Sequence, residues 1–414
     1  MKSLITLAFI SLSSVADGQA LTLEECYQRA EAHYPLIRQR GLIEKTATLS
    51  IENALKGNFP QISLGGQATY QSAVTMIPVE LPGVEPLDND QYRIFGEISQ
   101  TLYHGGVVAE QKKAVELNSS VETKKLEVDL YQLKSRINEL FFGILLFQEQ
   151  AAQSALIKQD LNAALKKTEA AIVNGTAMRS AADVLRAEIL KVEQRRIEMN
   201  SAETAYREIL GRFVDQSVAE TVLQKPQFVD SPVTISRPEL DLIDFQRKSI
   251  ESGQALLSAR KKPRVELFVQ GGYGRPGLNM LENNFDFYYL GGLRFSWLLS
   301  GYYTFRRESE ILTLRRQSLD VQKETFLFNT GLTLSQHEAE MAKLRRMIEV
   351  DNEIIALRAR VRQTAEAQLE EGVIASTDFI REVNAEDQAR QDRALHETQL
   401  LVAQAKYRFT SGQL

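Results

Sequence analysis

Side chains that could carry out chemistry are few and scattered in this sequence. The four histidines, His33, His104, His337 and His396, lie far apart and show no spacing typical of a metal site. The sequence contains no glycine-rich phosphate loop, no Gly-x-Ser-x-Gly motif and no His-Glu-x-x-His motif. The single cysteine, Cys26, cannot form an intramolecular disulfide. We therefore expect no enzymatic activity, no cofactor and no built-in metal.

The clearest charged pattern occurs twice, each time just after a glycine. The two sets are Gly175, Asp183 and Arg186, and Gly372, Asp378 and Arg381. An aspartate in the first turn of a helix is stabilised by the helix dipole, and Ser180 with Asp183 has the spacing of a capping box. For Asp183 we favour this capping role over a functional one, while for Asp378 both interpretations stay open.

The overall composition narrows the class of protein. The chain has 414 residues, with 49 Lys and Arg against 54 Asp and Glu, so its net charge of −5 argues against a broad nucleic-acid surface. A mean hydropathy of −0.24, with no apolar run near the roughly 18 residues that a spanning helix needs, argues against a helical membrane protein. A β-barrel stays possible, because its strands alternate apolar and polar residues. Basic residues at 260–262 and 306–307 flank predicted strands, and we interpret them as charges near lipid headgroups or as solvated faces.

The first 20 residues have the features of a secretory signal peptide. Lys2 precedes the apolar stretch 4–12, and the small residues Gly18 and Ala20 suit a signal peptidase. Cys26 lacks the preceding small-residue motif of a lipoprotein, so we interpret it as a helix residue and not as an acylation site. The mature chain is expected to begin at residue 21.

The mature chain contains an internal repeat. Residues 102–105 and 298–301 are similar and lie 196 residues apart, and the other matching segments occur in the same order in both halves. We therefore predict a first repeat over 21–212, a second repeat over 237–414 and a linker over 213–236. Ser236, with a proline and a glutamate after it, is expected to cap the helix that opens the second repeat.

Each repeat is expected to contain one β-hairpin, at about 60–104 and about 263–299. Residues such as Ile62 and Leu64 alternate with polar residues over about ten positions, the length of a tilted transmembrane strand. Nine of the 32 aromatic residues lie between Phe285 and Phe305, as in the aromatic belt of an outer-membrane barrel. The alternative is the edge of a soluble sandwich with these aromatic residues in its core.

Long helices are predicted after each β-hairpin. The stretch from Gly105 to Gly175 has no proline, and its apolar residues from Leu130 to Phe147 follow the alternating three–four spacing of a coiled coil. Met347 to Val361 repeats that spacing. A helix of this length would measure about 105 Å and would need partners along it. The segments 21–57 and 176–212 are predicted to be shorter helices that pack beside the first long one.

Four strands cannot close a barrel, so the chain is expected to oligomerise. Three copies would supply twelve strands and a tube of helices. The duplicated units, the signal peptide, the segment 21–26 that opens the mature chain and the two glycine turns resemble the TolC family of outer-membrane efflux channels. The resemblance covers residues 21 to 410. It implies a mainly α-helical chain with a small β part, a homotrimer with a twelve-stranded β-barrel in the Gram-negative outer membrane, and a coiled-coil α-barrel in the periplasm.

The resemblance also implies a function and its partners. Such a channel is the passive exit duct of a tripartite efflux or secretion system, and it docks a periplasmic adaptor protein and an inner-membrane transporter. Gly175, Asp183, Arg186 and Gly372 would then lie at the periplasmic tips, the expected gate and docking end. Asp378 matches an inward acidic ring of the family. A second acid is common one turn further, but Arg381 stands there, so a salt-bridge lock between Asp378 and Arg381 could replace a cation-binding ring.

The alternative function is that of a periplasmic coiled-coil adaptor or scaffold protein with a soluble β-domain. Such a domain would need several more strands for each helical hairpin to build a core. The number and placement of the strands therefore favour the channel.

Overall fold

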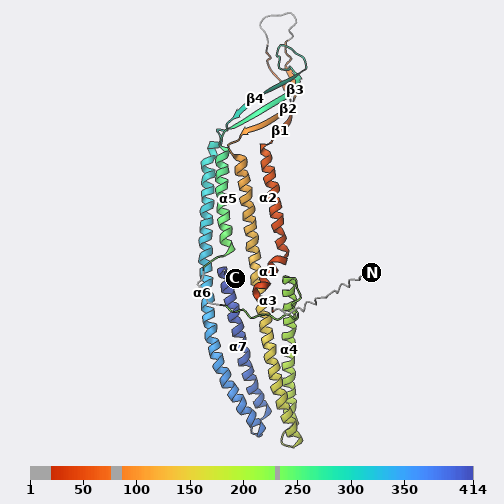
Figure 1. Cartoon of the computed structure of the whole chain (residues 1–414), viewed down its shortest axis with the longest axis vertical. Coiled ribbons are helices and arrows are strands. Elements are labelled where there is room, and N and C mark those ends of the chain that lie inside the picture. Colours follow the sequence, from red (N-terminus) through yellow and green to blue (C-terminus); the bar gives the residue numbers. More distant parts are fainter. Residues whose placement is uncertain (1–19, 76–85, 229–233, 414) are drawn as a thin grey trace, which may run out of the picture. The chain divides into compact units, whose positions relative to one another are not determined.

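The structure is a computed structural model that describes residues 20–75, 86–228 and 234–413. The expected signal peptide lies outside the described residues except for residue 20, and so does part of the expected linker. The chain is mainly helical with two pairs of strands, which confirms the predicted fold class (Figure 1). In order, the elements are α1 (Leu23–His33), η1 (Pro35–Arg38), α2 (Gln39–Leu55), η2 (Lys56–Asn58), β1 (Gln61–Tyr70), β2 (Asp90–Tyr103), α3 (Val107–Val173), α4 (Arg179–Val214), α5 (Pro238–Arg260), β3 (Arg264–Arg275), β4 (Asp286–Ser296), α6 (Gly301–Glu370) and α7 (Ser376–Ser411).

The chain folds into two compact units, and each unit takes segments from both predicted repeats. Of the described residues, the first unit comprises 20–37, 127–228, 234–238 and 325–413, and the second comprises 38–75, 86–126 and 239–324. The first unit contains α1, α4, α7 and the later parts of α3 and α6. The second contains α2, α5, the earlier parts of α3 and α6, and all four strands.

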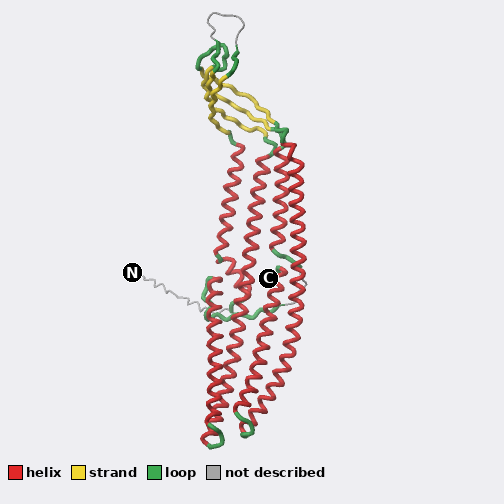
Figure 2. The backbone as a smooth tube through the Cα atoms, turned by 180° about the vertical axis from the view of Figure 1, so that it is seen from behind, coloured by secondary structure: helices red, strands yellow, loops and turns green. Residues whose placement is uncertain are grey.

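The strands of the second unit form one antiparallel sheet in the order β1-β2-β3-β4 (Figure 2). Ile62 lies opposite Ile98 and Ile98 opposite Val269, so the apolar residues that alternate along each strand share one face of the sheet. The intervening polar residues form the other face, where Phe95 lies opposite Gly65. The Phe95 ring occupies the space that a Cβ at Gly65 would need, since it lies 2.8 Å from that position. The odd apolar residue on the polar face therefore covers a glycine.

The core of the first unit is built from the first coiled-coil stretch. Ile137 and Ile144 of α3 are fully buried and pack in one cluster with Cys26 and Tyr27 of α1 and Leu210 of α4. Burying each of these large apolar side chains stabilises the fold by about 1.5–3 kcal/mol. Burial also raises the pKa of the Cys26 thiol to about 12, so this thiol stays protonated and unreactive.

The second coiled-coil stretch, on α6, is exposed in the single chain. Val350 and Leu357 have 53% and 55% of their surface exposed, and Met347, Ile354 and Val361 are similar. The two stretches have the same spacing, but within the described part of the chain the first is buried and the second is largely exposed.

Three local predictions need correction. The N-terminal helix is interrupted after α1, because Tyr34 precedes Pro35 and takes the extended conformation that such a residue prefers. Ser180 does not cap α4, since the helix begins at Arg179 after Met178 and Asp183 lies beyond its first turn. Ser236 does not cap α5 either, because α5 begins at Pro238 and the Ser236 hydroxyl donates instead to the carbonyl oxygen of Gly412.

Among the residues that the structure describes, one helix has a stretch long and apolar enough to cross a membrane. Within α3, an 18-residue window reaches a mean hydropathy of 1.3, and 39% of that window is buried in the structure. A helix in the core of a soluble protein meets the same criterion. The sequence-based argument against a spanning helix was therefore too strong, because the length and composition of α3 do not exclude one.

Candidate functional site at the helical hairpin tips

Two helical hairpins of the first unit end in matching turns. The first hairpin is formed by α3 and α4 and the second by α6 and α7, and each turn has five residues, 174–178 and 371–375. Gly175 and Gly372 have φ values of +73° and +69°, a backbone region that favours glycine. In each turn the residue after the glycine donates its N–H to a carbonyl five residues back, which ends the preceding helix in the same way. Both glycines predicted at the tips therefore serve as helix ends.

The predicted charged residues form ion pairs inside their own hairpin. Arg186 contacts Asp183 on the same helix at 3.2 Å and Glu169 of α3 at 2.8 Å. These carboxylates raise the pKa of the Arg186 guanidinium. Arg381 contacts Asp378 at 3.4 Å and Glu382 at 3.2 Å, all on α7. Within the described residues, none of these pairs joins one hairpin to the other.

Asp378 lies in the first turn of α7, three positions into the helix. A carboxylate there is stabilised by the helix dipole, by about 0.3–1 kcal/mol at an exposed site. The position of Asp378 therefore supports a role in stabilising the helix start, and a role in gating remains a proposal.

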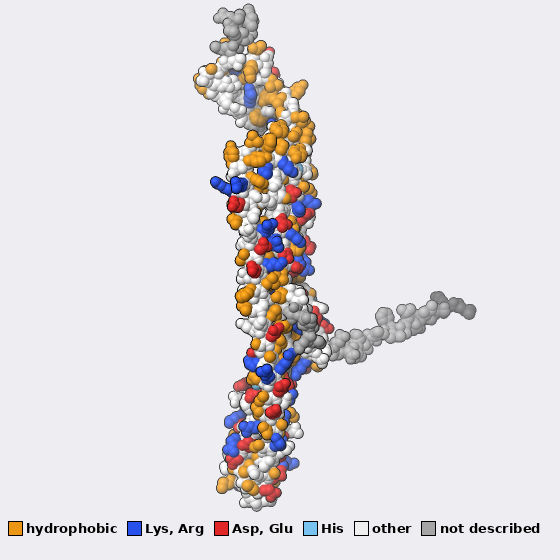
Figure 3. Space-filling model, turned by 90° about the vertical axis from the view of Figure 1, so that its left-hand side faces the viewer, with side chains coloured by type: hydrophobic (Ala, Val, Ile, Leu, Met, Phe, Trp, Pro, Cys, Tyr) orange, Lys and Arg blue, Asp and Glu red, His pale blue; other side chains and the backbone are white. Residues whose placement is uncertain are grey.

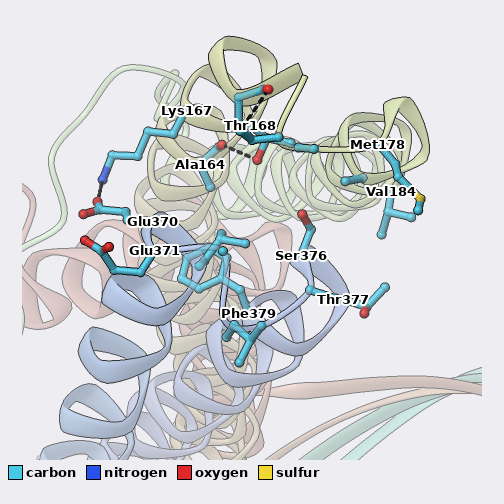
Figure 4. Close-up of a pocket in the computed structure, with 18 of the residues that line it drawn as sticks. Ala164, Lys167, Thr168, Met178, Val184, Glu370, Glu371, Ser376, Thr377 and Phe379 are labelled. Atoms are coloured by element: carbon cyan, nitrogen blue, oxygen red, sulfur yellow. Dashed lines mark hydrogen bonds and ion pairs between the residues drawn. The ribbon is translucent and has the colours of Figure 1, made fainter. Parts of the chain in front are cut away.

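A pocket of about 880 Å³ lies between the two tips (Figure 4). Residues of all four helices line it, with apolar side chains such as Val184 and Phe379 and with Lys167 and Glu370 in the ion pair shown in the figure. The apolar residues continue into a buried cluster that joins the hairpins and contains Leu161, Leu185 and Phe379. The tips are therefore joined by an apolar core below and by charged groups beside the pocket.

Ion pairs cross from α3 to α6. Lys167 forms ion pairs with Glu366, at 3.3 Å, and with Glu370. These two carboxylates raise the pKa of Lys167, chiefly through the hydrogen bond to Glu370. Arg362 reaches Asp160 at 3.6 Å. Because Lys167 is half exposed, each such pair contributes only about 0–1 kcal/mol.

Polar contacts also cross from α4 to α7. Arg195 contacts the carboxylate of Asp387 at 3.1 Å, and the Asn384 amide donates to Glu188 at 3.1 Å. Asp387 is only 5% exposed, and burial raises its pKa although Gln391 and Arg195 both hydrogen-bond to it. The second hairpin thus holds a desolvated carboxylate at its contact with the first.

These crossing pairs were missed at the sequence level, although a signal for them was present. Asn384 and Glu188 lie 196 residues apart, which equals the offset between the repeats. Arg195 and Asp387 are 192 apart, which differs from that offset by about one helical turn. Two hairpins that lie side by side and point the same way bring equivalent positions together. Opposite charges at nearly equivalent repeat positions were therefore candidates for contact.

Three of the four histidines contact separate partners. His396 lies 2.6 Å from Asp351, His33 lies 3.3 Å from Asp215 and His104 lies 2.8 Å from the Asn58 amide oxygen. Among the described residues, no group of three or more His, Cys, Asp or Glu side chains could hold a metal ion.

The sheet of the second unit presents an exposed apolar surface. On its apolar face Ile62, Leu64, Phe287 and Tyr289 each have about four fifths of their surface exposed. Figure 3 shows hydrophobic side chains gathered over the strands and the adjoining helix ends. On the polar face, charged side chains pair across the strands. Arg294 of β4 donates from both of its terminal nitrogens to the carboxylate of Glu97 on β2, at 2.8 and 2.9 Å. A soluble sheet would bury its apolar face, and this one exposes it.

Comparison with known proteins identifies the fold. No protein-family model and no curated protein matches the sequence. Among solved structures, the chain matches the outer membrane protein VceC of Vibrio cholerae with a TM-score of 0.68 and 13% identity, over 94% of this chain and 96% of VceC. It matches CusC with a TM-score of 0.67 and 13% identity, over 94% and 91% of the two chains. It matches the open state of the outer membrane channel MtrE of Neisseria gonorrhoeae with 0.66 and 14%, over 95% and 89%. The chain therefore has the fold of outer-membrane channels, which confirms the predicted resemblance to the TolC family at the level of the fold.

Proposed function

We propose that this protein is the outer-membrane exit channel of a tripartite efflux or secretion system in a Gram-negative cell. The exposed apolar face of the four-stranded sheet carries this proposal. Side chains such as Leu64 and Tyr289 are each about four fifths exposed, and water would disfavour a surface of this kind. Lipid would cover it without cost.

The sheet also supports a homotrimer. In the strand order β1-β2-β3-β4, β1 and β4 are edge strands, and among the described residues each has one side without a partner strand. Unpaired backbone groups are costly in lipid, so the edges must pair with other copies. Three copies supply twelve strands, enough to close a barrel. The exposed apolar residues of α6 would pack against a neighbouring copy in the same trimer.

The two predicted repeats fit this assembly. We infer that residues 21–212 and 237–414 are two copies of one unit and that 213–236 links them. The element order β1, β2, α3, α4 recurs as β3, β4, α6, α7. Helices from both repeats of each chain would line an aqueous tube in the periplasm.

The hairpin tips would be the periplasmic end, where the channel closes and where a periplasmic adaptor protein docks. An inner-membrane transporter would supply the energy. Gly175 and Gly372 form the turns, and Asp183, Arg186, Asp378 and Arg381 lie within the first eight residues of the helices that follow. The pocket between the tips supports docking, because it combines an apolar lining with charged groups from both hairpins.

The rival function, a periplasmic adaptor with a soluble β-domain, fits the sheet poorly. A soluble β-domain needs a second layer over the apolar face of its sheet. The described strands form one sheet only, and the apolar face of that sheet is exposed.

Cross-linking of β1 to β4 tests the trimer and the barrel together. Cysteine at Ile62 or Leu64 would be combined in one chain with cysteine at Tyr289, Gly291 or Leu293, all on the apolar face. After oxidation of outer membranes, at least one combination should give a covalent trimer on a denaturing gel. Cys26 can stay in place because it is fully buried and its pKa is about 12.

The matched control joins two neighbouring strands of the same chain. Ile98 and Val269 lie directly opposite each other in β2 and β3, so cysteines there should link within one chain and migrate as a monomer. A soluble periplasmic monomer with no cross-linked trimer in any combination would rule out the channel.

A further inference from the structure

A cluster of basic and aromatic residues lies where the strands meet the helices in the second unit. We call it the collar and define it as Lys261, Trp297, Tyr302, Tyr303, Arg306 and Arg307. The first of these precedes β3, and the others follow β4 or belong to the first two turns of α6. The collar continues the exposed apolar face of the sheet, through Phe295 and Leu298.

The contacts inside the collar fix its geometry. The Trp297 indole N–H donates to the carbonyl oxygen of Lys261 at 2.9 Å, which ties the end of β4 to the start of β3. The Lys261 ammonium lies over the rings of Phe305, at 3.3 Å, and Tyr302, at 5.4 Å. This lysine is thereby held against aromatic rings at the strand end.

The collar is open to its surroundings. Tyr303 is 83% exposed and Trp297 is 47% exposed. Arg306 and Arg307 are exposed too, and within the described part of the chain neither forms an ion pair. Two unpaired arginines beside exposed aromatic rings leave positive charge available to an external anion.

The first repeat differs from the second at the positions that correspond to the collar tyrosines. At the repeat offset of 196 residues, Gly106 and Val107 correspond to Tyr302 and Tyr303, and Glu110 and Gln111 correspond to Arg306 and Arg307. Counted from the first residue of each helix, however, the exposed Lys112 and Lys113 of α3 occupy the same sixth and seventh positions as Arg306 and Arg307 of α6. The two tyrosines at the start of α6, and not the pair of basic residues, therefore distinguish the second repeat.

We propose that the collar binds anionic phospholipid headgroups of the membrane leaflet next to the helices. The proposal rests on the proposed function, in which the strands cross the outer membrane and the helices lie in the periplasm. Tyrosine and tryptophan prefer the membrane–water interface, and arginine pairs with phosphate through two hydrogen bonds. An anionic lipid such as phosphatidylglycerol satisfies both the aromatic and the basic part of the collar, whereas a zwitterionic lipid carries no net charge for the arginines.

The chain offers its own probe for this proposal. Trp297 is the single tryptophan, and it lies in the collar. The purified protein would be reconstituted in phosphatidylcholine vesicles that contain an equal small fraction of either brominated phosphatidylglycerol or brominated phosphatidylcholine. Bromine quenches tryptophan only at short range. We expect quenching by brominated phosphatidylglycerol to exceed that by brominated phosphatidylcholine by about two-fold or more, since each basic residue near an anionic surface favours it by up to about five-fold.

The variant R306Q/R307Q should lose most of this preference. Its matched control is R315Q/R316Q, which removes the same charge from exposed arginines of the same helix, about 13 Å further from the strand. That control should keep the preference. Added free phosphate should not relieve the quenching if the source of the anion is a lipid, and relief would assign the site to soluble phosphate.

Two failures can be told apart. Equal quenching by both brominated lipids would overturn the collar as an anionic-lipid site while leaving membrane insertion intact. No quenching by either lipid would show that Trp297 is not near a bilayer, which would contradict the proposed function itself.

Discussion

At the scale of one residue, Asp387 shows how burial and pairing together set the stability of the contact between the hairpins. The structure desolvates this carboxylate to 5% exposure and provides Arg195 and Gln391 as partners, and burial still raises its pKa. Its partner Arg195 is 43% exposed and keeps much of its hydration. The pair is therefore a weak stabiliser, because solvent screens one partner while burial penalises the other.

Replacing Asp387 with Asn should stabilise the protein at neutral pH. Folding raises the pKa of Asp387, so the folded chain binds this proton more tightly than the unfolded chain, and the charged form is the one that costs stability. That cost disappears as the pH falls through the raised pKa toward the ordinary value of 3.8. The melting temperature of D387N, followed by circular dichroism, should exceed that of the parent at pH 7, and the gap should close on acidification.

Asp378→Asn is the control for that measurement. The residue lies in the first turn of the same helix and is 45% exposed, so removing its charge should lower stability slightly through the helix dipole. A melting temperature of D387N at or below that of the parent at pH 7 would contradict the argument.

Sequence reasoning reached some of these residues and missed others. The turn glycines were predictable, because a glycine at the end of a long periodic stretch marks a helix end. Asp183 was assigned to a cap because its spacing from Ser180 matched, but α4 starts two residues earlier than that cap requires. Asp387 and Arg195 lie in different repeats, and their pairing depends on how the hairpins lie side by side. Local spacing carries no such information.

At the scale of elements, the two coiled-coil stretches have the same apolar spacing but differ in burial. Ile137 and Ile144 of α3 are fully buried by α1 and α4, whereas Val350 and Leu357 of α6 are more than half exposed. Periodicity predicts that a helix has an apolar face, but it does not say whether the partner belongs to the same chain. The strands follow the same rule. Their alternation was readable from the sequence, and the exposure of the apolar face is what the structure adds.

Leu357→Asp should dissociate the trimer and leave the single chain folded. Its side chain is 55% exposed in the chain, so a charge there is solvated in the monomer. In the proposed trimer it would be buried against another copy, and each contact would lose about 1.5–3 kcal/mol of apolar burial in addition to the cost of the charge. Native mass spectrometry should show a large loss of trimer, and circular dichroism should show unchanged helix content.

Val373→Asp is the matched control outside the coiled-coil stretch of α6. Val373 is 70% exposed in the turn between α6 and α7, so the V373D protein should remain a trimer. A Leu357→Asp protein that stays trimeric would place the α6 stretch outside any contact between copies.

At the scale of the whole molecule, duplication would explain how the periplasmic end of the proposed channel opens. Two similar hairpins in each chain make six in a trimer, and they can close a tube only if neighbouring hairpins hold together at their tips. Within one chain, an apolar cluster and the crossing pairs of Lys167 and Arg195 do so. Three copies of a link worth about 0.5 kcal/mol would together shift an open–closed equilibrium by about ten-fold.

Lys167→Gln should therefore raise the conductance of the resting channel in planar bilayers. Lys167 joins α3 to α6, and its loss removes two ion pairs between the hairpins in each chain. Arg186→Gln is the matched comparison, because it also removes one positive charge from a tip, but its partners Glu169 and Asp183 belong to its own hairpin. We expect K167Q to increase the open fraction by up to about ten-fold and R186Q to change it little. Equal effects of the two would mean that only the net charge at the tip matters. An effect confined to D378N would instead assign the gate to the ring formed by Asp378 and Arg381.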